Sequence, residues 1–332
     1  MNEQIQNFLQ PYQKREVKEY ENSVPMDPKV SVVIGAYMQE SFISQCLQSV
    51  LNQKTNFEFE VLLGDDGSTD GTKKICAEIA EANPGIVRFF SNSRENQILL
   101  NNKETPIFCV TYLIGNVRGT YVILTDGDDY WSDENKLQIQ VDALEETGAD
   151  CCQTYWHELD SNELNLIAPP YHNKNDERVF MRPNKWNYHH VSTRLVRFNT
   201  LLQIFTRFGV RALNDGYFQR ILHDRATIVI VKKPTSVYRR HNKGIWTGLS
   251  RNKQLKKQLT RYRILSLWIP EKRYYYGLEK WIVRSHLIFS GRLPRKFAMK
   301  WALWCNRIEI AVTRSGNKLR AYQNESPLHL RE

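Results

Sequence analysis

Residues 121–131 read YVILTDGDDYW, and this stretch decides the fold. Tyr121–Thr125 is a short continuous apolar run, typical of a strand that is buried on both faces of a parallel sheet. It leads directly to Asp126, Asp128 and Asp129 on one tight turn. Carboxylates this close repel one another unless a cation lies among them, and their hard oxygen atoms suit Mg²⁺ or Mn²⁺. A solvated Asp-rich turn is the alternative, and the surrounding sequence decides between the two.

Apolar runs and helix patterns alternate on both sides of this turn. The order predicts a doubly wound α/β sheet, in which ligands bind beyond the carboxyl ends of the strands. Both acidic clusters, Asp65-Asp66 and Asp126–Asp129, follow such strand ends. The expected strands are Val30–Ile34, Phe59–Gly64, Ile86–Phe90, Tyr121–Thr125 and Ala149–Trp156, and the expected helices are Phe42–Leu51, Thr72–Ala82, Ile107–Val117 and Asp133–Thr147.

The segment DDGSTDGT, residues 65–72, combines acidic side chains, a glycine turn and hydroxyl groups before a helix. Ser68, Thr69 or Asp70 can cap that helix, whereas Asp66 is not needed for capping. We expect Asp66 to face the ligand and to accept a hydrogen bond from a nucleobase N–H or a ribose hydroxyl. The chain contains neither GxGxxG nor GxxxxGK[ST], so a dinucleotide fingerprint and a P-loop do not compete with this interpretation.

Three motifs occur in order and at compatible spacing: VSVVIGAYMQESFISQCLQSVLNQ, FEVLLGDDGSTDGT and GTYVILTDGDDYW. Together they resemble the family 2 glycosyltransferases of the GT-A fold. The resemblance is strong over residues 30–156 and weaker over residues 191–248. It implies a GT-A type doubly wound mixed sheet, a nucleotide-sugar donor and inverting transfer to an acceptor hydroxyl.

Carried over residue by residue, the resemblance implies a nucleotide-sugar-binding group at the ends of the first two strands. Gly35, Ala36 and Tyr37 would frame the nucleobase with Glu40 behind them, and Tyr37 would stack on the base. Asp66 would hydrogen-bond the base. Gly35 stands where the family usually has proline.

The resemblance also implies a metal site and a catalytic base. Asp126 would hold the ribose or the metal, Asp128 would ligate the metal, and the ion would be Mn²⁺ or Mg²⁺. The segment VYRRHNKGIWTG resembles the family's Y-R-x-H segment and makes His241 a further candidate ligand. RALNDGYFQRIL places Asp215 at the position of the base, with Asn214 where the family usually has glutamate.

These motifs predict how the chain divides. Residues 1–29 form a polar lead-in, residues 30–248 the GT-A domain and residues 249–332 a basic helical extension. Within the domain, residues 30–156 are the nucleotide-sugar half and residues 157–248 the acceptor half.

Charge is distributed very unevenly between the two halves of the chain. Residues 1–150 carry 12 Lys and Arg against 24 Asp and Glu, whereas residues 151–332 carry 34 basic against 12 acidic residues. Residues 251–320 add ten aromatic residues to 18 basic ones. Such a segment could lie on an anionic membrane surface, or it could pack as a helical subdomain with solvated charges.

The favoured function is inverting transfer of a sugar from a nucleotide sugar, with a UDP-sugar as the expected donor. The acceptor would be a glycan or a lipid-linked oligosaccharide in surface polysaccharide biosynthesis, and no nucleic acid partner is expected. The polar N-terminus and the absence of an 18-residue apolar run predict a cytoplasmic protein, with a peripheral position at the inner face of the membrane left open. A nucleotidyltransferase or a non-catalytic basic membrane- or nucleic-acid-binding protein is the alternative.

Overall fold

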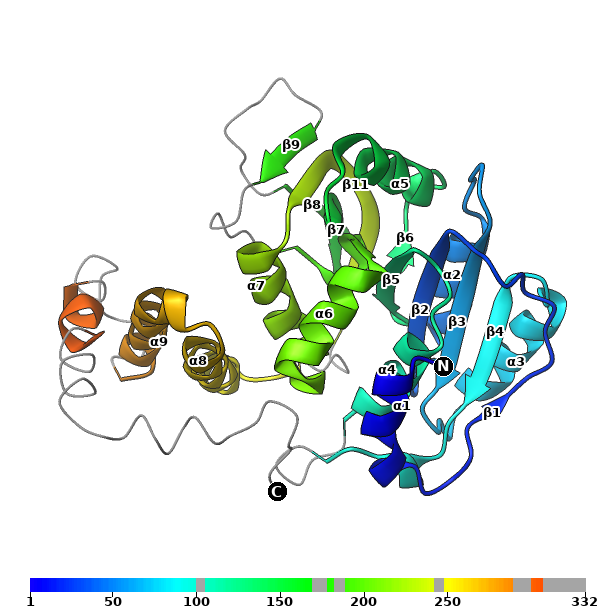
Figure 1. The fold of residues 1–332 in the computed structure, drawn as a ribbon, viewed down its shortest axis with the longest axis horizontal. Helices are drawn as coiled ribbons and strands as arrows, with labels where there is room; N and C mark the ends of the chain where they lie inside the picture. Colours follow the sequence, from blue (N-terminus) through cyan, green and yellow to red (C-terminus); the bar gives the residue numbers. More distant parts are fainter. Residues whose placement is uncertain (100–104, 169–177, 182–188, 242–247, 289–299, 307–332) are drawn as a thin grey trace. The chain divides into compact units, whose positions relative to one another are not determined.

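The computed structural model describes residues 1–99, 105–168, 178–181, 189–241, 248–288 and 300–306. The chain divides into two compact units, Met1–Arg240 and His241–Arg331. The first unit contains a mixed α/β sheet with helices on both faces, and the described part of the second unit is helical (Figure 1).

Parallel strands form the centre of the first unit: β2 (Val30–Ala36), β3 (Phe59–Asp65), β4 (Val87–Ser91) and β5 (Tyr121–Asp126). β2 lies between β3 and β5, and β4 pairs with β3. The register places Gly35 opposite Asp126 and Ala36 opposite Asp65. The carboxyl ends of these strands therefore lie at one edge of the sheet, as the sequence predicts.

The sheet continues beyond β5 with strands β10 (Arg194–Arg197), β7 (Cys151–Asp160), β11 (Ile228–Arg240) and β6 (Tyr130–Trp131). β10 is antiparallel to both β5 and β7, so it enters the sheet at the edge where β5 ends. β11 runs parallel to β7 and pairs with β6, which directly follows the acidic turn. The short strands β1 (Lys18–Glu19), β8 (Glu163–Ile167) and β9 (Arg178–Met181) pair with β4, β7 and β11.

Helices cover both faces of the sheet. Apolar side chains of α2 (Ile43–Leu51), α3 (Thr72–Ala82) and α5 (Lys136–Thr147) join one buried core with side chains of β2 and β3. α4 (Ile107–Gly115) packs on the other face, where a Cβ atom at Gly64 would lie 2.8 Å from Cys109 Sγ, and α1 (Glu3–Leu9) packs on α4. α6 (Phe198–Phe208) and α7 (Asp215–Arg225) follow β10.

The expected elements are present with shifted ends. α5 begins at Lys136 rather than Asp133, because Asp133 Oδ1 accepts the Asn135 N–H at 2.9 Å and turns the chain before the helix. The lead-in contributes to the core of the first unit, since Ile5 and Leu9 are buried. The 3₁₀ turns of this unit are Gln10–Tyr12, Arg94–Asn96, Val191–Thr193 and Val210–Leu213.

The second unit contains α8 (Arg251–Trp268), the 3₁₀ turn Pro270–Lys272, α9 (Arg273–Ile288) and a helical segment at residues 300–306. α8 packs against α9 through side chains that include the buried Tyr262 and Tyr276, whose ring centroids are 6.4 Å apart. Trp281 and Trp301 meet edge to face at 5.5 Å. Among the helices described, none has the length and apolar character needed to cross a membrane.

Candidate active site

Two acidic clusters lie at the carboxyl edge of the parallel strands. Asp65 ends β3 and Asp66 follows it, while Asp126 ends β5. β2 lies between them, and its last residues contact both neighbours through the register described above. The fold thus brings together residues that are 60 positions apart in the sequence.

Asp66 is 2% exposed, and the protein itself satisfies its carboxylate. Asn92 Nδ2 donates to Oδ1 at 2.8 Å, and Arg94 Nη1 donates to Oδ2 at 2.9 Å. Gln97 Nε2 lies 3.2 Å from both oxygen atoms. Burial raises the pKa of Asp66, and these donors oppose the rise. Asp66 is therefore covered by the segment that follows β4, whose side chains donate hydrogen bonds to both of its carboxylate oxygen atoms.

Arg94 connects Asp66 with Tyr37. Its guanidinium lies 4.3 Å from the centroid of the Tyr37 ring while one nitrogen donates to Asp66. Tyr37 is 43% exposed. A planar cation over an aromatic face is a favourable contact that leaves guanidinium N–H groups directed to the sides. At this part of the edge, the side chains of Tyr37 and Arg94 are accessible to solvent, and the buried Asp66 carboxylate holds Arg94 in place.

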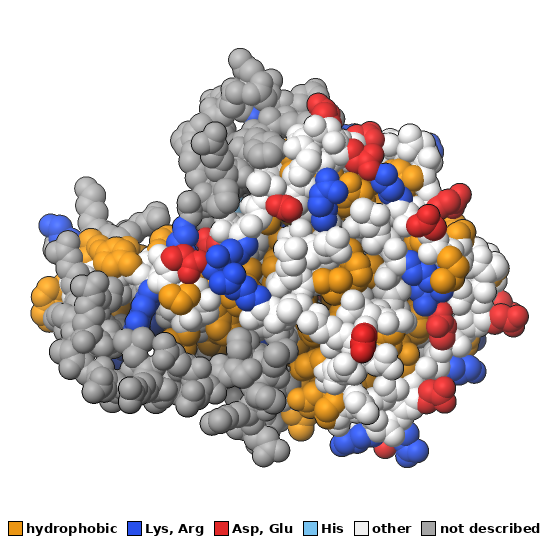
Figure 2. Space-filling view, in the orientation of Figure 1, with side chains coloured by type: hydrophobic (Ala, Val, Ile, Leu, Met, Phe, Trp, Pro, Cys, Tyr) orange, Lys and Arg blue, Asp and Glu red, His pale blue; other side chains and the backbone are white. Residues whose placement is uncertain are grey.

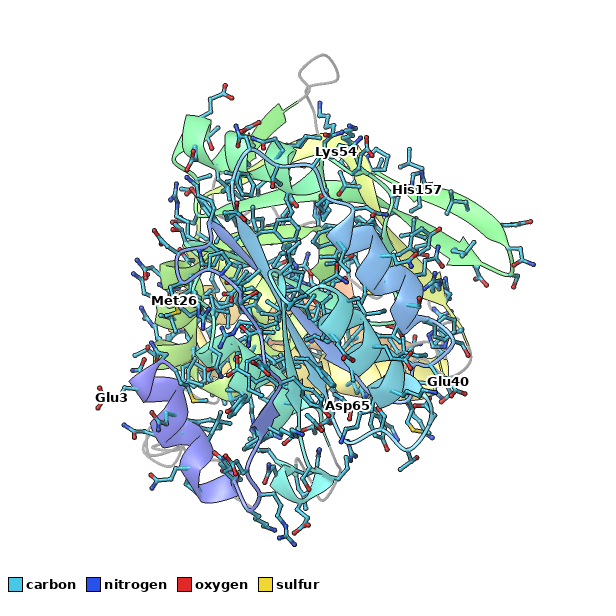
Figure 3. All side chains as sticks on the ribbon, turned by 90° about the vertical axis from the view of Figure 1, so that its right-hand side faces the viewer. Glu3, Met26, Glu40, Lys54, Asp65 and His157 are labelled. Carbon is cyan, nitrogen blue, oxygen red and sulfur yellow. The ribbon has the colours of Figure 1, made fainter. Side chains whose placement is uncertain are left out.

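The remaining predicted nucleotide-sugar residues shape the backbone nearby. Glu40 Oε2 accepts the Gly71 N–H at 2.7 Å and so caps the start of α3. Ala36 is buried, and its carbonyl accepts the Asp66 N–H at 2.9 Å. Gly35 lies in β2 beside Asp126. Glu40 and Asp65 are both labelled in Figure 3.

The acidic turn after β5 is held by β11. The Asp129 N–H donates to the Asp126 carbonyl at 3.0 Å, which closes the turn. Arg239 donates its backbone N–H to Asp129 Oδ1 at 2.9 Å and its Nη1 to the Asp128 carbonyl at 2.6 Å. Its guanidinium also lies 4.6 Å from the centroid of the Tyr130 ring. The turn is therefore fixed by a neighbouring strand and does not behave as a free solvated loop.

Asp126, Asp129 and His190 could hold a metal ion, because one ligand atom of each lies within 4.8 Å of the others. His190 precedes β10 and reaches the turn because β10 is antiparallel to β5. Its Nε2 is 3.6 Å from Asp129 Oδ2, and its ring stacks on Tyr238 at 4.5 Å. Asp129 is fully buried, and Oδ2 accepts no hydrogen bond from the residues that the structure describes. A buried carboxylate oxygen of this kind is the sort of atom that a cation satisfies.

The directions in which the pKa values of Asp126, Asp129 and His190 are shifted fit a cation site. Burial and then the nearby Arg194 charge lower the pKa of His190 to about 3, which leaves the imidazole neutral and able to donate a lone pair. Desolvation by the surrounding protein and then the charge of Asp128 raise the pKa of Asp126 to about 7, although its side chain is still partly accessible to solvent. Burial also raises the pKa of Asp129. A divalent ion would favour the ionised carboxylates, and two carboxylates with an imidazole suit Mn²⁺ or Mg²⁺.

Asp215 is the first residue of α7, and its carboxylate pairs with Arg194 of β10. The Arg194 side chain is 2% exposed, whereas the Asp215 side chain is 36% exposed. The charge of Arg194 also opposes the rise in the pKa of Asp126, and the strand register places Arg194 close to the carboxyl end of β5. The predicted base is therefore paired with a buried arginine at the strand end from which the acidic turn begins.

Two predicted metal ligands are not members of this group of three. Asp128 is half-buried on the same turn, and its carbonyl is engaged by Arg239. His241 is the first residue of the second unit.

Sequence reasoning missed His190, Arg94 and Arg194. Each lies in or next to a segment without a family motif, so only the sheet topology brings it to the edge. The dipeptide His189-His190 was the one available signal for the first of these.

Residues 31–205, more than half of the chain, match the family model described as glycosyl transferase family 2. An uncharacterized protein of Mycobacterium tuberculosis is 34% identical over 116 residues, which are 35% of this chain and 31% of that protein. The glycosyltransferase GlyA of Streptococcus pneumoniae is 23% identical over 228 residues, 64% of this chain and 31% of that protein. The chain thus spans about a third of the length of these relatives.

A solved fragment of Staphylococcus aureus TarS, residues 1–349 in complex with UDP-GlcNAc, superposes with a TM-score of 0.53. It is 16% identical and the match covers 79% of this chain and 73% of the fragment. The same fragment with UDP gives a TM-score of 0.52 at 14% identity over 87% of this chain and 93% of the fragment. The likeness concerns the fold, and it confirms the predicted GT-A type mixed α/β sheet. With the family model matching most of this sheet, the chain belongs to glycosyl transferase family 2.

Proposed function

We propose that this glycosyltransferase is metal-dependent and inverting, and that it transfers a sugar from a nucleotide sugar to an acceptor hydroxyl. The main support for this proposal is the buried Asp129 Oδ2 atom, which has no hydrogen-bond donor among the described residues. This oxygen faces His190 beside Asp126. A protein that used this turn only as structure would satisfy such an oxygen.

The residues of the edge divide the task between them. Asp126, Asp129 and His190 would hold Mn²⁺ or Mg²⁺, with Asp128 as a further carboxylate on the same turn. The ion would offset the negative charge that develops on the diphosphate leaving group. Arg94 and Tyr37 would contact the nucleobase, by hydrogen bonding and by stacking, while Asp66 keeps Arg94 in place.

The expected donor is a UDP-sugar, as the motif resemblance implies. The TarS fragment, which shares the fold, was solved with UDP-GlcNAc and with UDP. Uracil presents carbonyl oxygen atoms that a guanidinium such as that of Arg94 can donate to. Arg94 is thus compatible with the expected base, and experiment identifies the base and the sugar.

Asp215 would act as the general base. Its carboxylate would take the proton from the acceptor hydroxyl while that oxygen attacks the anomeric carbon from the face opposite the diphosphate. A single displacement inverts the anomeric centre, so the reaction does not require a covalent enzyme nucleophile. The partial exposure of the Asp215 carboxylate is compatible with contact to an acceptor.

A thermal-shift panel of nucleotide sugars, each with and without Mn²⁺, tests this function. A specific donor should raise the apparent stability only when Mn²⁺ is present, because ligands that bind the folded state stabilise it. Asp126→Asn should abolish the shift, and Asp142→Asn, which removes an exposed acid from α5, should leave it unchanged. Shifts that ignore Mn²⁺, or that survive Asp126→Asn, would argue against a metal-dependent donor site.

We further propose that the second unit attaches reversibly to anionic membrane, where a lipid-linked acceptor would be available. α8 carries six basic and no acidic residues, and five of the basic side chains are exposed: Arg251, Lys253, Lys256, Lys257 and Arg263. Exposed apolar or aromatic side chains lie in the same unit, namely Leu267, Tyr274, Tyr275 and Trp304. Lys and Arg side chains and hydrophobic side chains of this unit are visible together in Figure 2.

Such a surface suits lipid headgroups, because each basic residue near them contributes about 1 kcal/mol and aromatic rings favour the interface. Flotation of the full chain with phosphatidylserine vesicles at low and high salt tests the attachment. Lys253→Glu with Lys256→Glu should release the protein at low salt, whereas Lys73→Glu with Lys74→Glu on α3 should not. A wild-type chain that stays unbound at low salt would refute the attachment.

A further inference from the structure

Arg194 is the first residue of β10 and lies where that strand enters the sheet beside the end of β5. Because Leu195 pairs with Ile123, the residue before it is close to the carboxyl end of β5. Its side chain is 2% exposed. A buried guanidinium is costly unless acidic groups compensate it, so its surroundings indicate its role.

Arg194 contacts one acidic group of the site and an aromatic ring. Its Nη2 donates to Asp215 Oδ1, and its guanidinium lies 5.9 Å from the centroid of the Phe218 ring on the same helix. Its charge also opposes the rise in the pKa of Asp126 and favours the neutral imidazole of His190. Arg194 therefore pairs with the proposed base and lies close to the end of β5, where the proposed cation ligand Asp126 is found.

The pairing with Arg194 makes the two sides of the Asp215 carboxylate unequal. Oδ1 accepts a hydrogen bond from a buried group, while the side chain as a whole keeps 36% of its surface exposed. A charge-assisted hydrogen bond from a buried, planar guanidinium restrains the orientation of a carboxylate and stabilises its charge. Asp215 also lies in the first turn of α7, an 11-residue helix, where the helix dipole favours a negative charge.

We propose that Arg194 is a positioning residue for the base: it holds Asp215 ionised and oriented so that the free side of the carboxylate meets the acceptor. The inference rests on the proposed function, because it takes Asp215 as the base. In the step concerned, the acceptor O–H bond breaks and its proton goes to Asp215. The acceptor oxygen forms a bond to the anomeric carbon, and the bond to the diphosphate breaks with its electron pair going to the nucleoside diphosphate.

Acceptors that differ in their need for a base separate this role from a structural one. Water has a proton to lose when it attacks the anomeric carbon. Azide is already an anion, so its nitrogen forms the new bond, and the nucleoside diphosphate leaves, without any proton transfer. A residue that acts only through the base should matter for water and not for azide.

The experiment measures nucleoside diphosphate release from the sugar nucleotide that gives the largest thermal shift with Mn²⁺, in water alone and with added azide. Arg194→Met should lower water-driven release on the order of 10²-fold, since a general base contributes 10²–10⁴-fold. Its azide-driven release should stay close to that of wild type. Asp215→Asn should show the same selective loss, and Arg194→Lys, which keeps the charge without the planar guanidinium, should recover part of it.

Arg197→Met is the matched control. Arg197 lies on the same strand and donates to the carbonyls of Ala149 and Leu144, away from the acidic groups of the site. Both of its release rates should stay within about twofold of wild type or fall together. If Arg194→Met does not fold, Arg194→Lys supports the same comparison with a smaller loss.

Each outcome decides the matter. Selective loss of water-driven release in the Arg194 variants supports the positioning role. Equal losses with water and azide, or no loss, would overturn it while leaving the proposed transfer intact. If wild type releases no nucleoside diphosphate with either water or azide, for every sugar nucleotide of the panel, the proposed function is overturned and this inference with it.

Discussion

Asp66 and Asp129 lie at the same edge of the sheet, each close to the end of a buried strand, and both are buried. Burial raises the pKa of each carboxyl group. They differ in what their oxygen atoms contact. Both oxygens of Asp66 accept hydrogen bonds from side chains, whereas Asp129 uses one oxygen for the Arg239 N–H and leaves Oδ2 facing His190.

An acidic residue at a strand end therefore need not be a ligand. A carboxylate whose oxygens are all engaged supports its neighbours, as Asp66 supports Arg94. A buried carboxylate oxygen without a donor costs stability unless something else satisfies it. We therefore assign the cation to the second cluster and a supporting role to the first.

Activity should show the largest contrast between the two clusters. Asp126→Asn should lower transfer by at least ~10²-fold, because a group that stabilises transition-state charge is lost. Asp66→Asn should cost about tenfold, mainly as a higher KM, because it disturbs Arg94 and with it donor binding. Steady-state kinetics with the donor found by thermal shift measures both, and equal losses in kcat would erase the distinction.

Stability without metal should respond differently to substitution in the two clusters. Asp66→Asn should lower the free energy of unfolding by about 1–3 kcal/mol, because it leaves the partly buried Arg94 without its carboxylate. Asp129→Asn should leave it unchanged or raise it, because the amide oxygen still accepts the Arg239 N–H while an uncompensated charge is removed. Urea denaturation in chelator measures both values. Destabilisation by Asp129→Asn as large as that by Asp66→Asn would contradict the comparison.

The buried imidazole beside Asp129 adds a pH dependence. His190 has a folded-state pKa of about 3, below its ordinary value near 6.5, so the unfolded chain binds a proton first as the pH falls. Its contribution is present above pH 6.5 and is lost toward pH 3, with on the order of 1 kcal/mol lost between pH 7.5 and 5.5. Urea unfolding without metal at these two pH values should show a smaller loss for His190→Gln than for wild type. An equal loss would place the titration elsewhere.

Arg94 should give the smallest effect. Arg94→Met should weaken UDP binding about fivefold, the loss of one guanidinium contact at a partly exposed site. Mn²⁺ binding without nucleotide should not change, because Arg94 belongs to the Asp66 cluster. Isothermal titration with UDP and Mn²⁺ separates the two, with Arg15→Met, an exposed arginine paired with Glu95, as the control. An unchanged UDP affinity would remove Arg94 from the proposed nucleobase contacts.

The sequence predicted the parallel half of the sheet and both acidic turns. Those features depend on local patterns, because an apolar run followed by an acidic turn marks a buried strand and its carboxyl end. VSVVI and YVILT are therefore found as β2 and β5, with small shifts at their ends.

The residues that contact the acidic side chains are brought to them by pairing between distant segments. No local sequence pattern identifies these residues. His190 and Arg194 reach the turn only because β10 runs antiparallel to β5. Arg94 reaches Asp66 from the turn after β4. The sequence therefore indicated which carboxylates matter but not which of them the protein satisfies.

Mn²⁺ binding to the full chain, followed by electron paramagnetic resonance, tests the central claim most directly. Wild type should bind Mn²⁺ more tightly with UDP than without, because the ion contacts both the turn and the diphosphate. Asp129→Asn and His190→Gln should weaken that binding strongly, and Asp66→Asn should leave binding without nucleotide unchanged. Binding that survives Asp129→Asn, or that falls equally with Asp66→Asn, would contradict the assignment of the cation to the Asp126, Asp129 and His190 cluster.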